Sequence, residues 1–87
     1  MSDESPLQFP TEYPIRVVGR SDAALRPRID AVVRQYLPEL RDTEISERPS
    51  ANGTYLSITY SIVARDRDQV TALVAALVAS DGVLMVI

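Results

Sequence analysis

The sequence predicts one α+β domain in which two helices pack on one face of a four-stranded antiparallel sheet. Two stretches, within residues 21–36 and 66–78, repeat apolar residues at the period of an amphipathic helix. Four shorter stretches have the alternation or the β-branched residues that are typical of strands. Their order is β-α-β-β-α-β, for which the common solution is the ferredoxin-like, split βαβ arrangement.

The first strand is expected at Ile15–Val18, which is rich in β-branched residues and ends at Gly19. Residues 21–22 then offer an N-cap for the first helix, because Ser and Asp side chains accept hydrogen bonds from first-turn amides. Pro27 fits this helix only in or near its first turn, where the missing N–H is not needed. Pro38 is expected to end the helix. Its buried stripe is expected to consist of Leu25, Ile29, Val32, Val33 and Tyr36.

The second strand, Thr43–Arg48, alternates only weakly, and its polarity with Pro49 behind it suits the edge of a sheet. Asn52-Gly53 predicts a hairpin with a type I′ turn, because both residues tolerate the positive φ that this turn requires. The third strand then alternates strictly. It places Leu56, Ile58, Tyr60 and Ile62 on one face and Tyr55, Ser57, Thr59 and Ser61 on the other.

The second helix is expected to begin at Asp66, with Gln69 completing a capping box three residues later. Asp81-Gly82 is expected to follow its end, where glycine is common. The last strand, Val83–Ile87, is apolar throughout. The buried stripe of this helix is expected to consist of Val70, Leu73, Val74, Leu77 and Val78.

Right-handed crossovers place the first and third strands in the centre of the sheet and the other two at its edges. The face under the helices is expected to carry Ile15, Val17, Ile45, Leu56, Ile58, Tyr60 and Ile62. The opposite face, which we call the open face, is expected to carry Arg16, Val18, Tyr55, Ser57, Thr59 and Ser61.

The composition describes a small non-enzymatic domain. We assign residues 1–8 as a flexible acidic tail and residues 9–87 as a single ferredoxin-like domain. The chain has neither Cys nor His, so it lacks thiol nucleophiles, zinc-thiolate sites and the side chain that titrates near neutral pH. We therefore expect no catalytic residue, no metal site, no cofactor and no enzyme activity.

Charge and apolar patterning restrict the partners and the location. A net charge of −3 opposes the binding of nucleic acid, whose phosphates attract basic surfaces. The longest apolar runs are far below the roughly 20 residues that span a bilayer. The acidic start has neither the basic region nor the apolar region of a secretory signal. We expect a cytoplasmic protein that has no membrane partner and does not bind nucleic acid.

Three landmarks then carry a family resemblance: Phe9-Pro10-Thr11 leading into Arg16-Val17-Val18-Gly19, Pro49-Ser50 followed by Gly53, Tyr55 and Ser57, and the closing strand Val83–Ile87. Over residues 9–87 the chain resembles the YbeD-like family of small bacterial proteins of unassigned function. The resemblance implies a ferredoxin-like fold similar to ACT-type regulatory domains, which sense small metabolites, often amino acids, usually from paired subunits. The family commonly has a Lys before the hairpin glycine, where this chain has Asn52, so no role of that Lys is carried over. It supplies no agreed catalytic residues.

Two surfaces are candidates for binding a ligand or a partner. The hairpin at residues 48–55 combines amides, a hydroxyl and a guanidinium that could bind an anion, but the same residues are also good turn formers. The open face carries a stripe of hydroxyls beside an arginine, which suits either a ligand platform or an ordinary solvated face. The candidate residues are Arg16, Arg48, Ser50, Asn52, Tyr55 and Ser57.

The last strand, Val83–Ile87, favours a second subunit. A strand with one face in water should alternate, and this one is apolar on both faces. Either the tail, the segment at residues 9–13 or another subunit must cover it. We expect a homodimer, which could form through this strand, the open face or the hairpin.

Several activities of this architecture need residues that the chain lacks. Metal-transfer domains need paired cysteines in the first loop, and RNA-binding sheets need aromatics on both central strands. Acylphosphatases need an anion cradle after the first strand, where this chain has Asp22. Two hypotheses remain. One is an ACT-like regulatory or protein-interaction module, homodimeric, that acts on an unidentified protein; the alternative is a sensor that binds an amino acid or related metabolite at a subunit seam.

Overall fold

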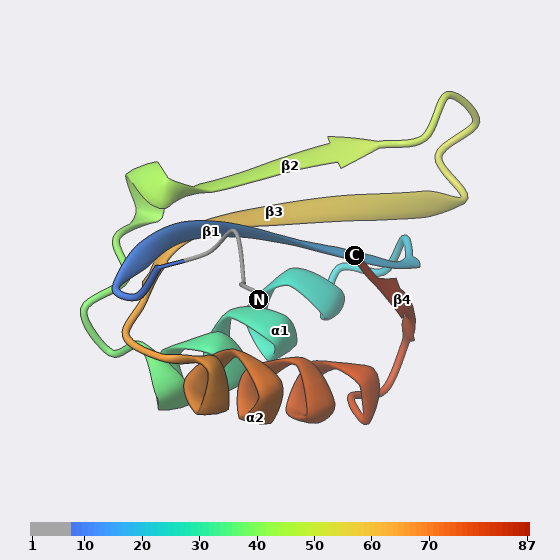
Figure 1. Ribbon diagram of the computed structural model, residues 1–87. Coiled ribbons are helices and arrows are strands. Elements are labelled where there is room, and N and C mark those ends of the chain that lie inside the picture. The colour runs from blue at the N-terminus through green and yellow to red at the C-terminus, as the bar shows by residue number, and fades with distance from the viewer. Residues whose placement is uncertain (1–7) are drawn as a thin grey trace, which may run out of the picture.

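The computed structural model describes residues 8–87, so the predicted tail lies outside the described residues except for Gln8. Four strands and two helices follow one another in the predicted order (Figure 1). They are β1 (Thr11–Arg20), α1 (Leu25–Tyr36), β2 (Ile45–Pro49), β3 (Tyr55–Ala64), α2 (Arg67–Val78) and β4 (Val83–Val86), with a short 3-10 turn, η1 (Asp42–Glu44), before β2.

The strands form one antiparallel sheet in the order β2-β3-β1-β4, and both helices lie on the same side of it (Figure 1). The fold class and the predicted strand order are therefore confirmed. β1 and β3 are paired along their whole lengths, from Thr11 opposite Ala64 to Arg20 opposite Tyr55. This central pair holds the open face together.

β1 begins four residues earlier than predicted and contains Pro14. The hydrogen bonds of Arg16 explain why a proline is tolerated there: its N–H donates to the carbonyl of Ile87 (3.1 Å) and its carbonyl accepts from the N–H of Ile87 (2.8 Å). Two residues earlier, the nitrogen of Pro14 faces the same side but lies beyond the end of β4. No strand needs an N–H at that point.

The tip of the β2–β3 hairpin is longer than the predicted two-residue turn. Ser50 closes it by donating its N–H to the carbonyl of Tyr55 (2.8 Å), so four residues lie between this closing pair. Gly53 has the expected positive φ of 77°, and its N–H donates to the carbonyl of Ser50 (2.9 Å). The side-chain oxygen of Asn52 accepts from the N–H of Thr54 (3.1 Å), which stabilises the wider loop. The type I′ prediction is therefore wrong.

β2 also begins later than predicted, at Ile45, because residues 42–44 form η1. Glu44 closes that turn: its N–H donates to the carbonyl of Arg41 (2.9 Å), and its carboxylate accepts from the N–H of Arg41 (2.9 Å). Thr43 and Glu44 are thus not part of the strand. The C-terminal part of β3, after Tyr60, consequently extends beyond Ile45, the first residue of β2.

The core lies between the sheet and the two helices. Pro27 is the third residue of α1, within its first turn as predicted. The predicted N-cap at residues 21–22 is wrong: Ala24 occupies the cap position without a side-chain hydrogen bond, and Asp22 accepts from the N–H of Ala24 (2.9 Å), ahead of the first turn. The buried core residues are Ile15, Val17, Leu25, Ile29, Val33, Leu37, Leu40, Leu56, Ile58, Tyr60, Ile62, Ala64, Val70, Leu73 and Leu77. Leu37 and Leu40, which follow α1, were not expected in it.

Helix α2 begins as predicted, but its last turn is less buried than predicted. Asp66 accepts from the N–H of Gln69 (2.8 Å), while the side chain of Gln69 accepts from Arg65 (2.7 Å) rather than from Asp66. Val78, predicted to be buried, is 60% exposed, because it lies about 100° around the helix from buried Leu77, in the last turn. Neither helix in the described residues is long and apolar enough to cross a membrane.

Candidate functional site

The pairing of the strands determines which side chains are neighbours on the open face. Thr59 lies between Arg16 of β1 and Ser46 of β2, and Ser57 lies between Val18 and Arg48 in the next row. A hydroxyl therefore occupies the centre of each row. Both rows belong to one open hollow of about 530 Å³.

Two guanidinium groups flank this hydroxyl pair from opposite sides. From the usual strand and residue spacings, the Cα atoms of Arg16 and Arg48 are about 12 Å apart on the diagonal. Both side chains are long enough to reach toward the hydroxyls between them. Among residues 8–87, neither guanidinium has a hydrogen-bond or ion-pair partner. The residues that line the hollow are Arg16, Ser46, Glu47, Arg48, Ser57 and Thr59.

The one carboxylate of this hollow is held by a group outside it. Glu47 accepts a hydrogen bond from Arg26 of α1 (2.7 Å), on the helix side of the sheet. The hydrogen bond to Glu47 is the main reason why the pKa of Arg26 is raised, although partial burial opposes it. Arg26 is shared between Glu47 and Asp30, so it compensates the charge of Glu47 in part. Within the hollow, the two guanidinium groups of Arg16 and Arg48 face this one carboxylate, which leaves a net positive charge.

The hairpin residues of the predicted site do not join this hollow. The hydroxyl of Ser50 donates to the side-chain oxygen of Asn52 (3.0 Å) and accepts from the N–H of Tyr55 (3.0 Å). These polar groups hold the loop together, as the turn-forming alternative requires. Tyr55 is 43% exposed at the base of the hairpin, opposite Arg20.

The structure thus brings together three of the six predicted residues, Arg16, Arg48 and Ser57. It adds Thr59, which the predicted open face already contained, and Ser46, which sequence reasoning missed. The signal for Ser46 was available: it lies two residues before Arg48 in the same strand and therefore shares its face.

A second polar cluster, also missed, lies under the sheet. Tyr60 is fully buried, and its hydroxyl donates to Asp30 of α1 (2.6 Å). Arg26 donates to the same carboxylate through its Nε (2.9 and 3.0 Å) and continues to Glu47. This chain of contacts ties α1 to the central strand β3 and to the edge strand β2.

β4 leaves apolar side chains in contact with solvent. Val83 and Val86 pack on the core, whereas Leu84, Met85 and Ile87 are 49%, 51% and 66% exposed. A register shift between Val18 and Gly19 makes Leu84 the extra residue of a bulge, which breaks the alternation. Met85 pairs with Val18 and therefore belongs to the open face.

The segment at residues 9–13 does not cover these side chains. Phe9 and Tyr13 are partly buried against the core cluster, on the helix side of the sheet. That alternative for covering β4 is therefore wrong, and the expected second subunit remains a prediction.

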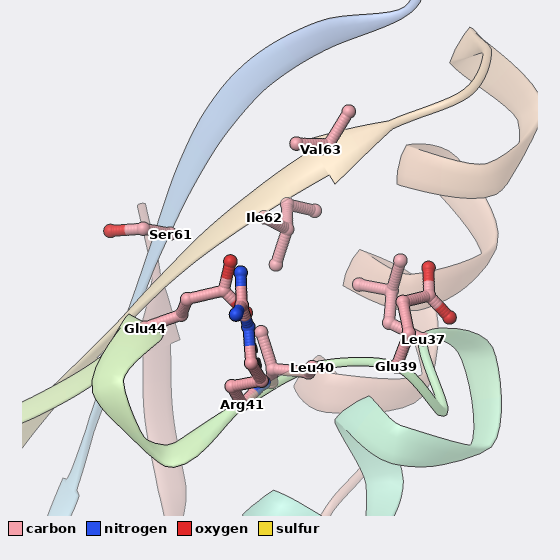
Figure 2. Close-up of a pocket in the computed structure, with 8 residues that line it drawn as sticks. All are labelled: Leu37, Glu39, Leu40, Arg41, Glu44, Ser61, Ile62 and Val63. Carbon is pink, nitrogen blue, oxygen red and sulfur yellow. Dashed lines mark hydrogen bonds between the residues drawn. The ribbon is translucent and has the colours of Figure 1, made fainter.

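A second groove lies at the opposite end of β3 from the hairpin (Figure 2). It consists of two adjoining hollows of about 290 and 310 Å³, which share Glu44, Ser61, Ile62 and Val63. Figure 2 shows the loop between α1 and η1 facing the end of β3 across the first of them.

Two solved protein structures have a fold similar to that of this chain. The ACT domain from the GTP pyrophosphokinase of Chlorobium tepidum matches with a TM-score of 0.69 at 20% identity, covering 88% of this chain and 97% of that one. Protein HP0495 from H. pylori matches with a TM-score of 0.74 at 12% identity, covering 99% of this chain and 90% of that one. At these identities the likeness concerns the fold.

Comparisons of sequence place the chain more narrowly. A UPF0250 protein of Nitrosomonas europaea is 36% identical over 77 residues, which are 88% of each chain. A UPF0250 protein of Shewanella amazonensis is 36% identical over 81 residues, 93% of this chain and 90% of that one. The model of the family described as "Protein of unknown function (DUF493)" matches residues 4–87. The chain therefore belongs to the DUF493 family, the YbeD-like proteins that its landmarks resemble.

Proposed function

We propose that this chain is a non-enzymatic, ACT-like regulatory module that binds an acidic surface of a partner protein through its open face. The observation that carries the proposal is the pair of guanidinium groups, Arg16 and Arg48, which have no partner among residues 8–87. Arginine binds carboxylates through two parallel hydrogen bonds, so two arginines on one rigid sheet select a pair of acidic groups.

The surroundings of the two arginines favour a protein partner. The hydroxyls of Ser46, Ser57 and Thr59 add donors and acceptors between the two guanidinium groups. Met85 and Ile87 supply an apolar margin on the same face, next to Arg16. A mixed surface that is rich in Arg and apolar side chains is typical of protein interfaces. The fold of the ACT domain in a GTP pyrophosphokinase supports a regulatory use.

Replacing both arginines with alanine is the test of this function. We expect the Arg16→Ala/Arg48→Ala variant to lose the specific partners that the unchanged chain retains from lysate of its own cells, measured by quantitative mass spectrometry. Its stability should change by less than about 0.5 kcal/mol, because neither side chain is hydrogen-bonded to the described residues.

Arg65→Ala is the matched control, since Arg65 is also exposed but follows the opposite end of β3. This variant should retain the same partners as the unchanged chain. If the double variant captures the same set of proteins as the control, the open face is not the docking surface and the proposal is wrong.

A second candidate function is a sensor that binds an amino acid at the seam of a homodimer. It is favoured by a hollow of about 290 Å³ in which Arg16 and Thr59 lie beside Pro14 and the exposed Ile87. If two copies paired along this apolar margin, the guanidinium of Arg16 would lie at the seam, where it could hold the carboxylate of a ligand.

Oligomeric state and ligand response together separate the two functions. The sensor requires a homodimer by light scattering at roughly tens of micromolar protein, and a rise in melting temperature with an amino acid that Arg16→Ala abolishes. A monomer whose melting temperature responds to no amino acid excludes the sensor. That result leaves the docking module, which the capture experiment tests on its own.

A further inference from the structure

β3 has an uncovered edge near its end. The pairing of β2 with β3 stops at Ile45 opposite Tyr60, because η1 turns the chain away, whereas β3 continues to Ala64. Residues 61–64 therefore have β1 on one side and no described strand on the other. This edge is about 13 Å long, from the usual rise per residue.

The main-chain groups that face this edge follow from the hydrogen bonds of the hairpin. The carbonyl of Tyr55 accepts from Ser50, so the main chain of Tyr55 faces β2. Every second residue of an antiparallel strand faces the same side, which assigns the N–H and carbonyl of Val63 to the free edge. Within the described part of the chain, these two groups have no hydrogen-bond partner.

The groove beside this edge has an apolar floor and an acidic rim (Figure 2). Its floor contains Leu37, Leu40 and Ile62. Val63, which is 54% exposed, follows Ile62 in β3, so its side chain lies on the opposite face of the sheet. The charged residues that line the two hollows are Glu12, Glu39, Glu44 and Arg41. The hollow over the floor has Glu39 and Glu44 against Arg41, and the adjoining hollow has Glu12 and Glu44. Each hollow is therefore lined by a net negative charge.

We propose that this edge binds an extended basic segment of a partner protein, which adds a short strand to β3. The main chain of the segment would pair with Val63, the pattern that peptides use on exposed sheet edges. One apolar side chain of the segment would lie on the floor, over Ile62. A Lys or Arg side chain next to it would lie near Glu44.

The charge pattern argues against a second copy of this chain as the occupant. The edge strands of the sheet are β2 and β4. Val83–Val86 of β4 carries no basic side chain, and in β2 the charge of Arg48 is balanced by Glu47, so neither edge has the net positive charge that the acidic rim favours. A partner segment that alternates basic and apolar residues matches both the rim and the floor. The site lies toward the C-terminal end of β3, beyond the two rows that carry the arginine pair, and does not depend on the proposed function.

The test uses the full chain labelled with ¹⁵N and a blocked peptide, acetyl-Lys-Val-Lys-Val-Lys-amide. We expect saturable changes in the amide signals of residues 61–64 and slower hydrogen exchange at the Val63 amide. A peptide with Glu in place of each Lys should bind at least about fivefold more weakly, because its charges meet the acidic rim. Glu44→Gln should weaken binding of the Lys peptide, whereas Asp81→Asn, the same change of charge at an exposed residue ahead of β4, should leave it unchanged.

Val63→Pro removes the edge donor without touching the pairing with β1, and proline is tolerated where an edge N–H faces solvent. It should weaken binding at least about fivefold, the value of one hydrogen bond. A peptide methylated on alternate main-chain nitrogens tests the companion bond, from the peptide N–H to the carbonyl of Val63, on the unchanged protein. Equal affinity for the Lys and Glu peptides, signal changes centred on β4, or Val63 exchange that slows with protein concentration alone would each overturn the proposal.

Discussion

Replacing Gly19 with alanine is expected to lower the free energy of unfolding by about 2–3 kcal/mol, the upper part of the range for overpacking a filled site. Gly19 is buried in β1, where β4 and the start of α1 approach it. A Cβ at this position would lie 2.6 Å from the carbonyl oxygen of Gly82 and 2.9 Å from Cδ2 of Leu25. Both distances are below van der Waals contact, so the surrounding structure must move.

The carbonyl of Gly82 cannot withdraw at low cost. It accepts the N–H of Arg20 (3.1 Å), one of the hydrogen bonds that join β1 to the segment leading into β4. Moving it away from a new methyl group would stretch this bond and shift β4 against the core. Urea unfolding followed by circular dichroism measures the loss.

Gly53→Ala is the control, because it introduces backbone strain without a steric clash. Gly53 has a φ of +77°, and an added Cβ would meet no atom within 4 Å. Only the strain of the left-handed backbone remains, about 1 kcal/mol. If Gly19→Ala and Gly53→Ala destabilise the chain equally, close approach is not what requires glycine at position 19.

The stability curves of the unchanged chain and Tyr60→Phe are expected to cross between about pH 10 and 12. Burial raises the pKa of Tyr60, and the hydrogen bond to Asp30 raises it further. In the unfolded chain a tyrosine titrates near pH 10. Below that pH the hydroxyl is protonated in both states, and the variant loses about 1.5–2 kcal/mol with the hydrogen bond to the charged carboxylate of Asp30.

Above pH 10 the sign of the effect reverses. The unfolded chain ionises at Tyr60 while the native chain keeps its proton, so the unfolded state is favoured by up to about 1.4 kcal/mol for each further pH unit. By pH 12 this amounts to roughly 2–3 kcal/mol, which Tyr60→Phe does not lose. The variant should therefore be less stable at neutral pH and more stable at pH 12.

Denaturant unfolding at a series of pH values measures the crossing. Near-ultraviolet absorbance provides a second readout, because one of the four tyrosines should ionise only on unfolding and this step should be missing in the variant. Two curves that stay parallel through pH 12 would show that Tyr60 ionises in the native state, contrary to its burial and its bond to Asp30.

Half of the candidate site was predictable from local pattern. Alternation along one strand assigns Arg16 and Ser57 to the face away from the helices, and the same rule applied to β2 assigns Arg48. Ser50 and Asn52 are candidates because the amides, hydroxyl and guanidinium of their loop could bind an anion, although the same residues are good turn formers. Only the coordinates reveal that these polar groups are hydrogen-bonded within their own loop.

The cluster of Tyr60, Asp30 and Arg26 shows what local pattern misses. Tyr60 was correctly placed in the core by alternation, but its buried hydroxyl needs a partner, and the partner is 30 residues away in the chain. Arg26 reaches Glu47, 21 residues away, in the same manner. Pairs at such distances depend on how α1 lies over the sheet.

The element order, the two faces of β3 and the start of α2 follow from local sequence pattern, because periodicity and capping act over a few neighbouring residues. Three other features follow from tertiary contacts: β2 pairs with only part of β3, β4 contains a bulge, and Val78 is exposed. Each of these depends on segments that are distant in the chain and meet only after folding. The free edge at Val63 and the arginine pair on the open face both arise in this way.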